Sequence, residues 1–268
     1  MVTKTSVTSE AYSKFDILST NNLEILRELA KRIHDSSQAA QSQHDVEEMV
    51  HEYELGVEMY VPILMAQSKI VWDTGNYEGV EKLLKRSQDV CGDHPTWKLN
   101  LAHSLYMQEG KYKSAIEFYE PLTEIHESIL NVPAVILANL CVSYIMCSLN
   151  EEAEDLMRRI EKEEEISQSE DSSHRFYHFC IVNLVIGTLY CSKGNYEFGI
   201  SRVLKSLEPF QKKLGTDTWY YTKKCLVSLH ETLAKHLIVV KDSVFEEIFT
   251  FLDMCELHGR NISGILFA

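Results

Sequence analysis

The sequence predicts an all-α fold, an α-solenoid built from antiparallel helix pairs. The 268 residues include only 11 Gly and 5 Pro, and such scarcity of turn-forming residues favours long helices joined by short connections. Short turns recur along the chain, and the residues around each turn repeat the same order of large and small side chains. Self-similarity of this kind is typical of helical units that bury their apolar faces by stacking on neighbours.

Four related units, each centred on a turn between two helices, define the repeat. The turns read GNY at 75–77, GKY at 110–112, SLN at 148–150 and GNY at 194–196, so successive turns lie 35, 38 and 46 residues apart. The first interval is close to the tetratricopeptide period of about 34 residues, and the longer ones require insertions. The sequence therefore predicts a tetratricopeptide-repeat superhelix, with an irregular helical bundle as the alternative.

Small side chains on the first helix of each pair indicate where two helices approach closely. Ser68, Cys141 and Gly187 occupy this position in three units, whereas His103 takes it in the second. Antiparallel helices come close only where one presents a small side chain and a large neighbour fills the space beside it. Glycine at the start of a turn leaves the helix in a left-handed conformation without steric cost.

The pattern also predicts the domain organisation. Residues 1–20 are expected to be a flexible N-terminus, followed at 21–59 by a helical pair with a polar linker. Residues 60–210 hold the four repeats, in which an acidic, Ser-rich loop at 161–173 accounts for the widest interval. Residues 211–268 are predicted to form a degenerate C-terminal helical pair.

Charge and hydropathy exclude two classes of partner. Lys and Arg number 26 against 40 Asp and Glu, which gives a formal net charge of −14. A net negative chain repels nucleic-acid phosphates and anionic lipid, so we expect neither as a partner. Residues 134–149 are mostly apolar, but interrupting polar residues and the repeat pattern argue against a membrane span.

No constellation of catalytic, cofactor or metal-binding residues stands out, so we predict no enzyme activity, no cofactor and no metal. His174, His178 and Cys180 form a partial zinc-ligand spacing without a fourth ligand, as do Cys255 and His258. The seven cysteines are odd in number and lack a C-x-x-C pair, which is typical of reduced, buried thiols.

The predicted binding surface is the concave face of the superhelix, because the first helices of stacked pairs line that side. It is mostly apolar, and we expect a segment of another protein to cover it, burying Trp72, Trp97 and Met107. The alternative is that these side chains pack on adjacent helices of a tightly wound superhelix. The inward residues, by register, are Pro62, Met65, Lys69, Trp72, Trp97, Asn100, Ser104, Met107, Val135, Ala138, Val142, Ile145, Ile181, Leu184 and Thr188.

Several long segments carry a resemblance to a known family. They are WKLNLAHSLYMQEGKYKSAIEFYEPL from residue 97, CIVNLVIGTLYC at 180–191 and LGTDTWYY at 214–221. These segments strongly resemble the tetratricopeptide repeat protein thirty family, the seventy-kilodalton subunit of intraflagellar transport complex B. The likeness runs from about residue 10 to residue 261 and matches only the C-terminal part of the longer family members.

The resemblance implies a function that the repeat alone does not. It implies a scaffold in the cilium and cytoplasm that wraps around a segment of the fifty-two-kilodalton subunit of complex B. It also implies a link to kinesin-2, and roles in anterograde transport, cilium assembly and axonemal tubulin polyglutamylation. A generic tetratricopeptide-repeat adaptor outside cilia is the alternative, and a hydrolase-like enzyme is a distant third.

Overall fold

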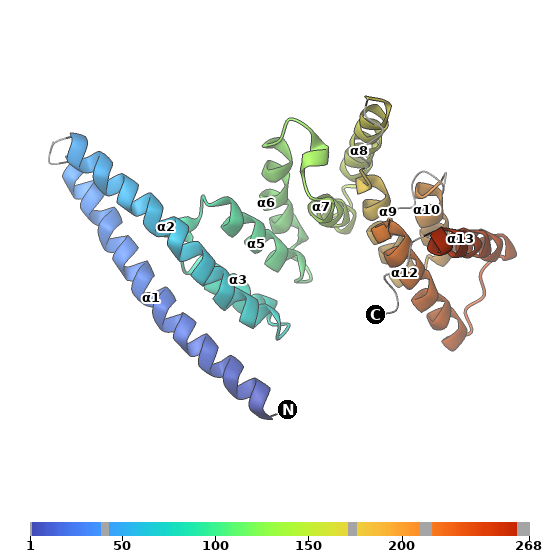
Figure 1. The fold of residues 1–268 in the computed structure, drawn as a ribbon, viewed down its shortest axis with the longest axis horizontal. Helices are drawn as coiled ribbons and strands as arrows, with labels where there is room; N and C mark the ends of the chain where they lie inside the picture. The colour runs from blue at the N-terminus through green and yellow to red at the C-terminus, as the bar shows by residue number, and fades with distance from the viewer. Residues whose placement is uncertain (1, 39–42, 171–175, 209–215, 262–268) are drawn as a thin grey trace. The chain divides into compact units, whose positions relative to one another are not determined.

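The computed structural model describes residues 2–38, 43–170, 176–208 and 216–261, and every regular element within them is a helix (Figure 1). Consecutive helices turn back on one another through short connections, as the repeat predicted. The predicted all-α helical-repeat class is therefore confirmed. The chain divides into two compact units, residues 1–118 and 119–268, with the boundary inside helix α6. Each unit is described by itself.

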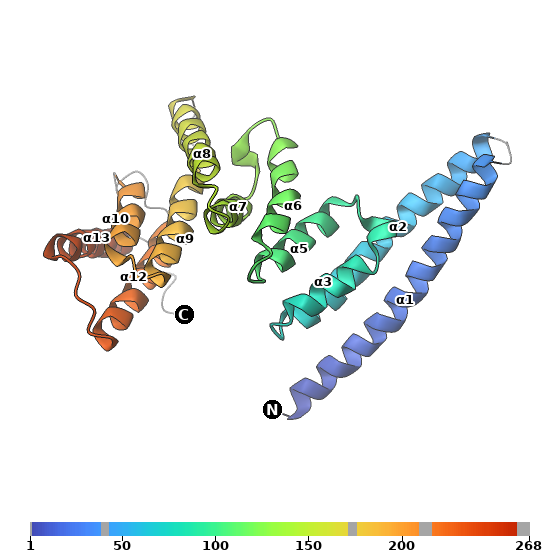
Figure 2. The same cartoon turned by 180° about the vertical axis from the view of Figure 1, so that it is seen from behind.

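A long helical hairpin opens the first unit. Helix α1 (Val2–Gln38) and helix α2 (Gln43–Trp72) lie side by side along most of their length (Figures 1 and 2). The backbone is helical from Val2, which corrects the prediction of a flexible segment over residues 1–20. Further along this helix, Ser19 and Leu23 are buried and Ser19 Oγ lies 3.3 Å from Tyr60 Oη on α2, so the two helices pack together there.

Helix α2 spans a boundary that the sequence analysis predicted between the helical pair at 21–59 and the first repeat. The expected boundary between residues 59 and 60 lies inside this single 30-residue helix, which continues past Pro62. Proline removes one backbone donor from a helix interior, but packing of Tyr60, Val61 and Leu64 in the core compensates for that loss. The polar linker predicted within residues 21–59 covers residues 36–43. Of these, residues 36–38 and 43 are helical, and residues 39–42 lie outside the described residues.

Shorter helices complete the first unit. Trp97 on α5 is buried between them, because its Nε1–H donates to the carbonyl oxygen of Leu84 at 3.0 Å and its ring meets Phe118 edge-on. These elements are α3 (Tyr77–Lys85), α4 (Gln88–Cys91), α5 (Pro95–Tyr106) and α6 (Tyr112–Glu124).

The second unit stacks three helix pairs around an apolar core. Leu204, Leu226, Ile248 and Phe251 are buried in one cluster that draws on α10, α12 and α13. Helices α9 and α10 form a tightly packed pair, and α9 also packs on α7. The elements are η1 (Ile129–Asn131), α7 (Ala134–Met146), α8 (Asn150–Glu170), α9 (His178–Ser192), α10 (Tyr196–Ser206), α12 (Thr216–Lys235) and α13 (Asp242–Asn261).

All four predicted turns contain one residue in the left-handed conformation at the same place. The φ angles are 75° at Gly75, 81° at Gly110, 63° at Ser148 and 85° at Gly194. The four turns are therefore equivalent in backbone geometry as well as in sequence. Ser148 adopts this conformation although it carries a Cβ, which costs of the order of 1 kcal/mol and is offset by packing of α7 against α8.

Helix α8 corrects the prediction of an acidic loop at 161–173. The helix continues to Glu170, and residues 171–173 lie outside the described residues. Two of its carboxylates bind neighbouring backbone, because Glu163 accepts from the N–H of Ile129 at 3.0 Å and Glu164 from the N–H of Phe179 at 2.8 Å. The acidic stretch thus anchors the segments before and after it.

A buried carboxylate in the first unit makes stability depend on pH. Burial alone would raise the pKa of Glu81, but hydrogen bonds from Lys111, Lys85 and Gln108 outweigh burial and lower its pKa to about 2. A depressed folded-state pKa contributes stability that is complete above the unfolded value of 4.5 and disappears as pH falls through about 2.

We expect Glu81→Gln to cost roughly 2 kcal/mol at neutral pH and to flatten the fall in stability between pH 4.5 and about 2. Urea unfolding at a series of pH values measures this. The control is Glu78→Gln on the solvent side of the same helix, where Glu78 pairs with exposed Lys82. An acid profile of the Glu81 variant that matches the parent chain would contradict this account.

Candidate partner-binding cavity

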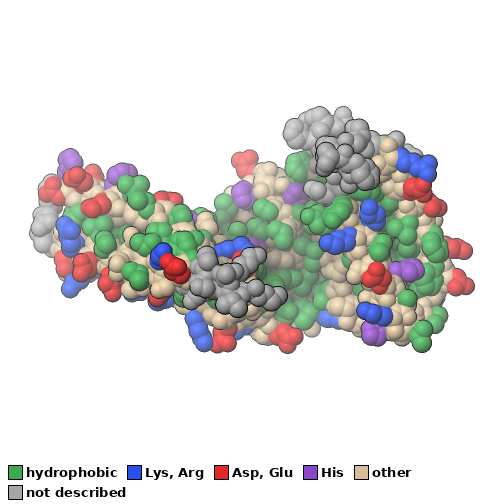
Figure 3. Space-filling model, turned by 60° about the horizontal axis from the view of Figure 1, so that its bottom comes forward, with side chains coloured by type: hydrophobic (Ala, Val, Ile, Leu, Met, Phe, Trp, Pro, Cys, Tyr) green, Lys and Arg blue, Asp and Glu red, His purple; other side chains and the backbone are tan. Residues whose placement is uncertain are grey.

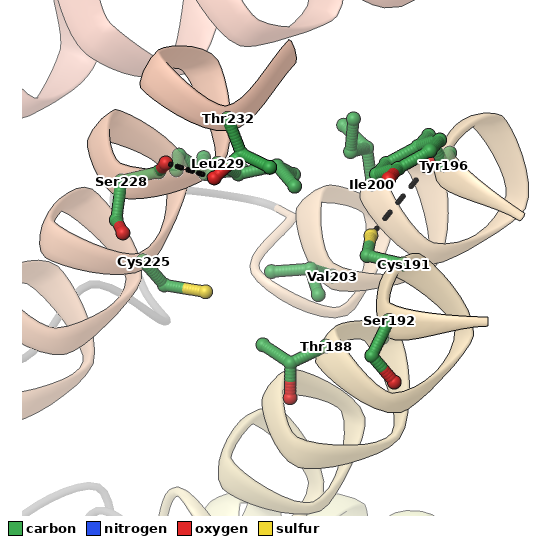
Figure 4. A pocket seen from close by; sticks show the side chains of 12 residues that line it. Thr188, Cys191, Ser192, Tyr196, Ile200, Val203, Cys225, Ser228, Leu229 and Thr232 are labelled. Atoms are coloured by element: carbon green, nitrogen blue, oxygen red, sulfur yellow. Dashed lines mark hydrogen bonds between the residues drawn. The ribbon is translucent and has the colours of Figure 1, made fainter. Parts of the chain in front are cut away.

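Three helices of the second unit enclose a cavity of about 430 Å³ (Figure 4). Helix α9 contributes Thr188 and Cys191, and α12 lies opposite with Cys225 and Leu229 pointing toward the space. Helix α10 contributes Tyr196, Ile200 and Val203 to the lining. Helices α9 and α12 are the first helices of successive pairs, and first helices are the ones whose inward face the sequence predicted for binding. Binding of a partner in this cavity stays a prediction.

Two glycines fix the wall of this cavity. A Cβ on Gly187 would lie 2.3 Å from Val203 Cγ2 and 2.7 Å from the carbonyl oxygen of Gly199, and a Cβ on Gly199 would lie 2.5 Å from the carbonyl oxygen of Gly187. Helices α9 and α10 therefore touch backbone to backbone, as the predicted small site at Gly187 required. This contact determines where Thr188 and Cys191 lie relative to α12.

The cavity surface is mainly hydrocarbon, and both threonine hydroxyls in its lining bond to their own helices. Thr188 Oγ1 donates to the carbonyl oxygen of Val185 at 2.7 Å, and Thr232 Oγ1 donates to that of Ser228 at 3.0 Å. None of the described residues that line the cavity is charged. Removing water from a surface of this kind costs little free energy, so it suits an apolar side chain.

The two thiols in the cavity are poor nucleophiles. Burial raises the pKa of the Cys191 thiol to about 11, with the nearby Cys225 adding to the effect, and burial also raises the pKa of Cys225. Both are therefore protonated near neutral pH, and the thiolate is the reactive form. All seven cysteines are free, and five of them are buried.

The structure divides the fifteen predicted binding residues into two groups. Four are buried within the chain itself and are not available to a partner in this conformation, which corrects their predicted role. They are Trp97, Ser104, Ala138 and Val142. Trp97 packs on adjacent helices through its contacts with Leu84 and Phe118, which for this residue is the alternative left open by the sequence.

The remaining eleven are at least partly accessible, and their role in binding stays a prediction. Met107 is 41% exposed and Val135 is 54% exposed, whereas Trp72 is half-buried with its ring edge-on to Tyr77. Thr188 is the one of these that lines the α9–α12 cavity. The other seven are Pro62, Met65, Lys69, Asn100, Ile145, Ile181 and Leu184.

Sequence reasoning missed the α12 side of the cavity. Cys225, Ser228, Leu229 and Thr232 line it, but no inward register was assigned to the degenerate C-terminal pair. The available signal was the i, i+3, i+4, i+7 spacing of these four residues, which places them on one helix face.

The partial zinc spacings do not form a metal site within the described residues, where no group of three or more His, Cys, Asp or Glu converges. His174 lies outside those residues. His178 Nε2 lies 2.9 Å from the carbonyl oxygen of Val132, whereas Cys180 Sγ donates to that of Ser206, so the two side chains serve different backbone groups.

Hydrophobic side chains reach the surface of both units among acidic and basic ones (Figure 3). Ile25 and Met59 are examples in the first unit, as are Val135 and Phe198 in the second. Across the described part of the chain, no helix combines the length and the apolar character that crossing a membrane requires.

Helix pairs of this geometry, with an uncharged cavity between successive first helices, define an α-helical repeat protein. Comparison with known families is more specific. The model of the intraflagellar transport protein 70 C-terminal domain matches residues 1–268, and the chain belongs to this family. The resemblance seen in the sequence and the expected setting, the cilium and the cytoplasm, are confirmed at the level of the family.

Curated relatives agree with the family match. The chain is 54% identical to human intraflagellar transport protein 70B over 267 residues, which cover 99% of this chain and 40% of the relative. It is 52% identical to zebrafish intraflagellar transport protein 70A, of which it covers 41%, and 55% identical to the bovine 70B protein. The chain thus spans about two fifths of the length of the relatives it matches.

Proposed function

We propose that this chain is a non-enzymatic protein-binding scaffold of intraflagellar transport. The observation that carries the proposal is the uncharged cavity between α9 and α12, two first helices of successive pairs, because helical repeats line their binding face with first helices. An apolar side chain from a protein segment fills that cavity, and neighbouring half-buried residues such as Ile181 and Leu184 extend the contact along α9.

The family supports a finer version of the proposal. We infer that the chain acts in complex B, where it supports anterograde transport and cilium assembly and contributes to axonemal tubulin polyglutamylation. The proposed partners are the fifty-two-kilodalton subunit, other complex B subunits and kinesin-2. The support is the family match over the whole chain together with relatives named intraflagellar transport protein 70.

Two other functions find less support. A repeat adaptor outside cilia shares the fold but not the family match. For an enzyme, the residues around the cavity offer hydrocarbon, bonded hydroxyls and thiols whose pKa is raised by burial, and these groups suit binding better than nucleophilic catalysis.

A pair of threonine substitutions tests the proposed site. Thr232→Trp fills the cavity from α12, and we expect it to weaken capture of the co-expressed fifty-two-kilodalton subunit by at least about tenfold, because an occupied cavity excludes the partner's side chain. Co-purification followed by calorimetric titration measures the effect.

Thr250→Trp on α13 is the matched control. Thr250 is exposed outside the cavity, and its Oγ1 donates to the carbonyl oxygen four residues earlier, as that of Thr232 does. If the parent chain and the Thr232 variant bind equally well and circular dichroism shows that both are folded, this cavity is not the binding site. If the parent chain does not bind the subunit at all, the fifty-two-kilodalton subunit is not the partner.

A further inference from the structure

Arg202 on α10 is a half-buried guanidinium that forms no ion pair with a carboxylate of the described residues. Its Nε–H donates to Asn183 Oδ1 at 2.8 Å, and its Nη2 lies 2.8 Å from the sulfur of Met157. Its guanidinium carbon also lies 5.9 Å from the centre of the Phe198 ring. A thioether is a weak acceptor and the amide is neutral, so these contacts orient the cation without balancing its charge.

Burial sets Arg202 apart from Arg159, the other arginine in the described part of this unit without an ion pair to a described residue, because Arg159 is exposed. In the described part of residues 119–268, Arg158 pairs with Glu154 and Asp155, Lys241 with Glu197, and Arg260 with Glu256. Neither Arg202 nor Lys205, three residues later, forms an ion pair there, although the chain carries a net charge of −14. Carboxylates are abundant, yet no described one lies within ion-pair distance of either cation.

The two cations line a cavity of about 410 Å³ among α8, α9 and α10. Phe179 and Phe198 provide aromatic surface, and Phe198 is 46% exposed. The cavity lies on the opposite side of α10 from the α9–α12 cavity, because Arg202 and Lys205 are about half a turn from Ile200 and Val203. It is a second site in the same unit.

We propose that this second cavity binds the carboxylate of an acidic residue in a peptide segment, with an adjacent apolar residue of the peptide against Phe198. Arg202 and Lys205 supply the charge-assisted hydrogen bonds, and Asn183 holds the guanidinium in place. The site is separate from the α9–α12 cavity, so it stands whether or not the proposed function does.

Local charge favours a carboxylate over a phosphate. Asn183 and Met157 engage the Nε–H and one Nη2–H of Arg202, which leaves three N–H groups of Arg202 and the ammonium of Lys205 for an anion. These donors suit either anion, so the charges that line the cavity decide between them. Glu161 also lines the cavity, and its negative charge disfavours a dianion more than a monoanion.

Nuclear magnetic resonance of the Arg202 side chain tests the proposal directly. The ¹⁵N-labelled chain is titrated with the acetylated and amidated tripeptide Phe-Glu-Phe, and the Nε–H resonance of Arg202 is assigned by its loss in Arg202→Lys. We expect a saturable shift of that resonance, and Lys205→Gln to raise Kd by at least about fivefold. Lys224→Gln, an exposed lysine on α12, is the matched charge control and is expected to change Kd by less than about twofold.

Four outcomes would overturn the proposal. They are a resonance that does not shift, equal binding of the uncharged tripeptide Phe-Gln-Phe, an equal loss of affinity in the Lys224 control, and tighter binding of inorganic phosphate than of the Glu peptide. Thermal unfolding of each variant is measured alongside. Loss of binding in a Lys205 variant that unfolds like the parent chain counts for the proposal, and unchanged binding in that variant counts against it.

Discussion

Gly187→Ala is expected to lower the free energy of unfolding by about 3 kcal/mol, although it adds only one methyl group. The new Cβ would lie 2.3 Å from Val203 Cγ2 and 2.7 Å from the carbonyl oxygen of Gly199. Val203 is buried and the second neighbour is backbone, so the strain is relieved only by separating α9 from α10. Urea unfolding followed by circular dichroism measures the change.

Gly194→Ala is the matched control for this substitution. Gly194 has a φ of 85°, but a Cβ there would have no atom within 4 Å. Its cost is therefore only that of the left-handed conformation, about 1 kcal/mol. A Gly187 variant that loses no more stability than the Gly194 variant would show that the α9–α10 contact is not as close as described.

Trp97→Ala is expected to destabilise the first unit by about 4 kcal/mol. The indole is 1% exposed, its N–H bonds to the carbonyl oxygen of Leu84, and its ring centre lies 6.4 Å from that of Phe118. Truncation removes this packing and leaves a buried carbonyl oxygen without its donor. Chemical unfolding of the variant and the parent chain measures the loss.

Met107→Ala provides the comparison, because Met107 is 41% exposed and was placed by the sequence on the same predicted surface as Trp97. We expect it to change stability by less than about 1 kcal/mol. If the Trp97 variant instead keeps the stability of the parent chain while partner capture is lost, the indole contacts the partner and its burial in the chain is not its function.

The repeat itself was predictable from sequence because its signals are local. Gly75, Gly110 and Gly194 mark turns that require a left-handed residue, and Gly187 marks a close helix contact. Even Ser148, which breaks the glycine pattern, takes the left-handed conformation at the predicted place. Each of these features depends on a few residues near one another in the chain.

Other features depend on packing between distant segments and were missed for that reason. Helix α1 contacts α2 where Ser19 approaches Tyr60, and helix α8 is bonded near its end by the backbone N–H groups of Ile129 and Phe179. The composition of residues 1–20 and 161–173 is polar and predicts flexible segments. The contacts with distant segments are not visible in that composition.

The predicted inward residues divide into buried and accessible ones because first helices are buried on more than one side. Trp97, Leu101 and Ser104 on α5 are all buried, so an apolar side chain at a predicted inward position fits the protein's own interior equally well. Periodicity cannot separate these two environments. The cavity at α12 and the cations at Arg202 and Lys205 became visible only when helices from different repeats were brought together.

The most direct test of the central claim, that a partner occupies the α9–α12 cavity, uses two native thiols. Cys225 is half-buried and lines that cavity, whereas Cys147, also half-buried, does not. Alkylation rates of both are measured by mass spectrometry in mildly alkaline buffer, with and without the fifty-two-kilodalton subunit. Bound partner should slow the reaction of Cys225 by at least about tenfold and leave that of Cys147 unchanged. An unchanged rate at Cys225, or an equal slowing of both thiols, would contradict the account.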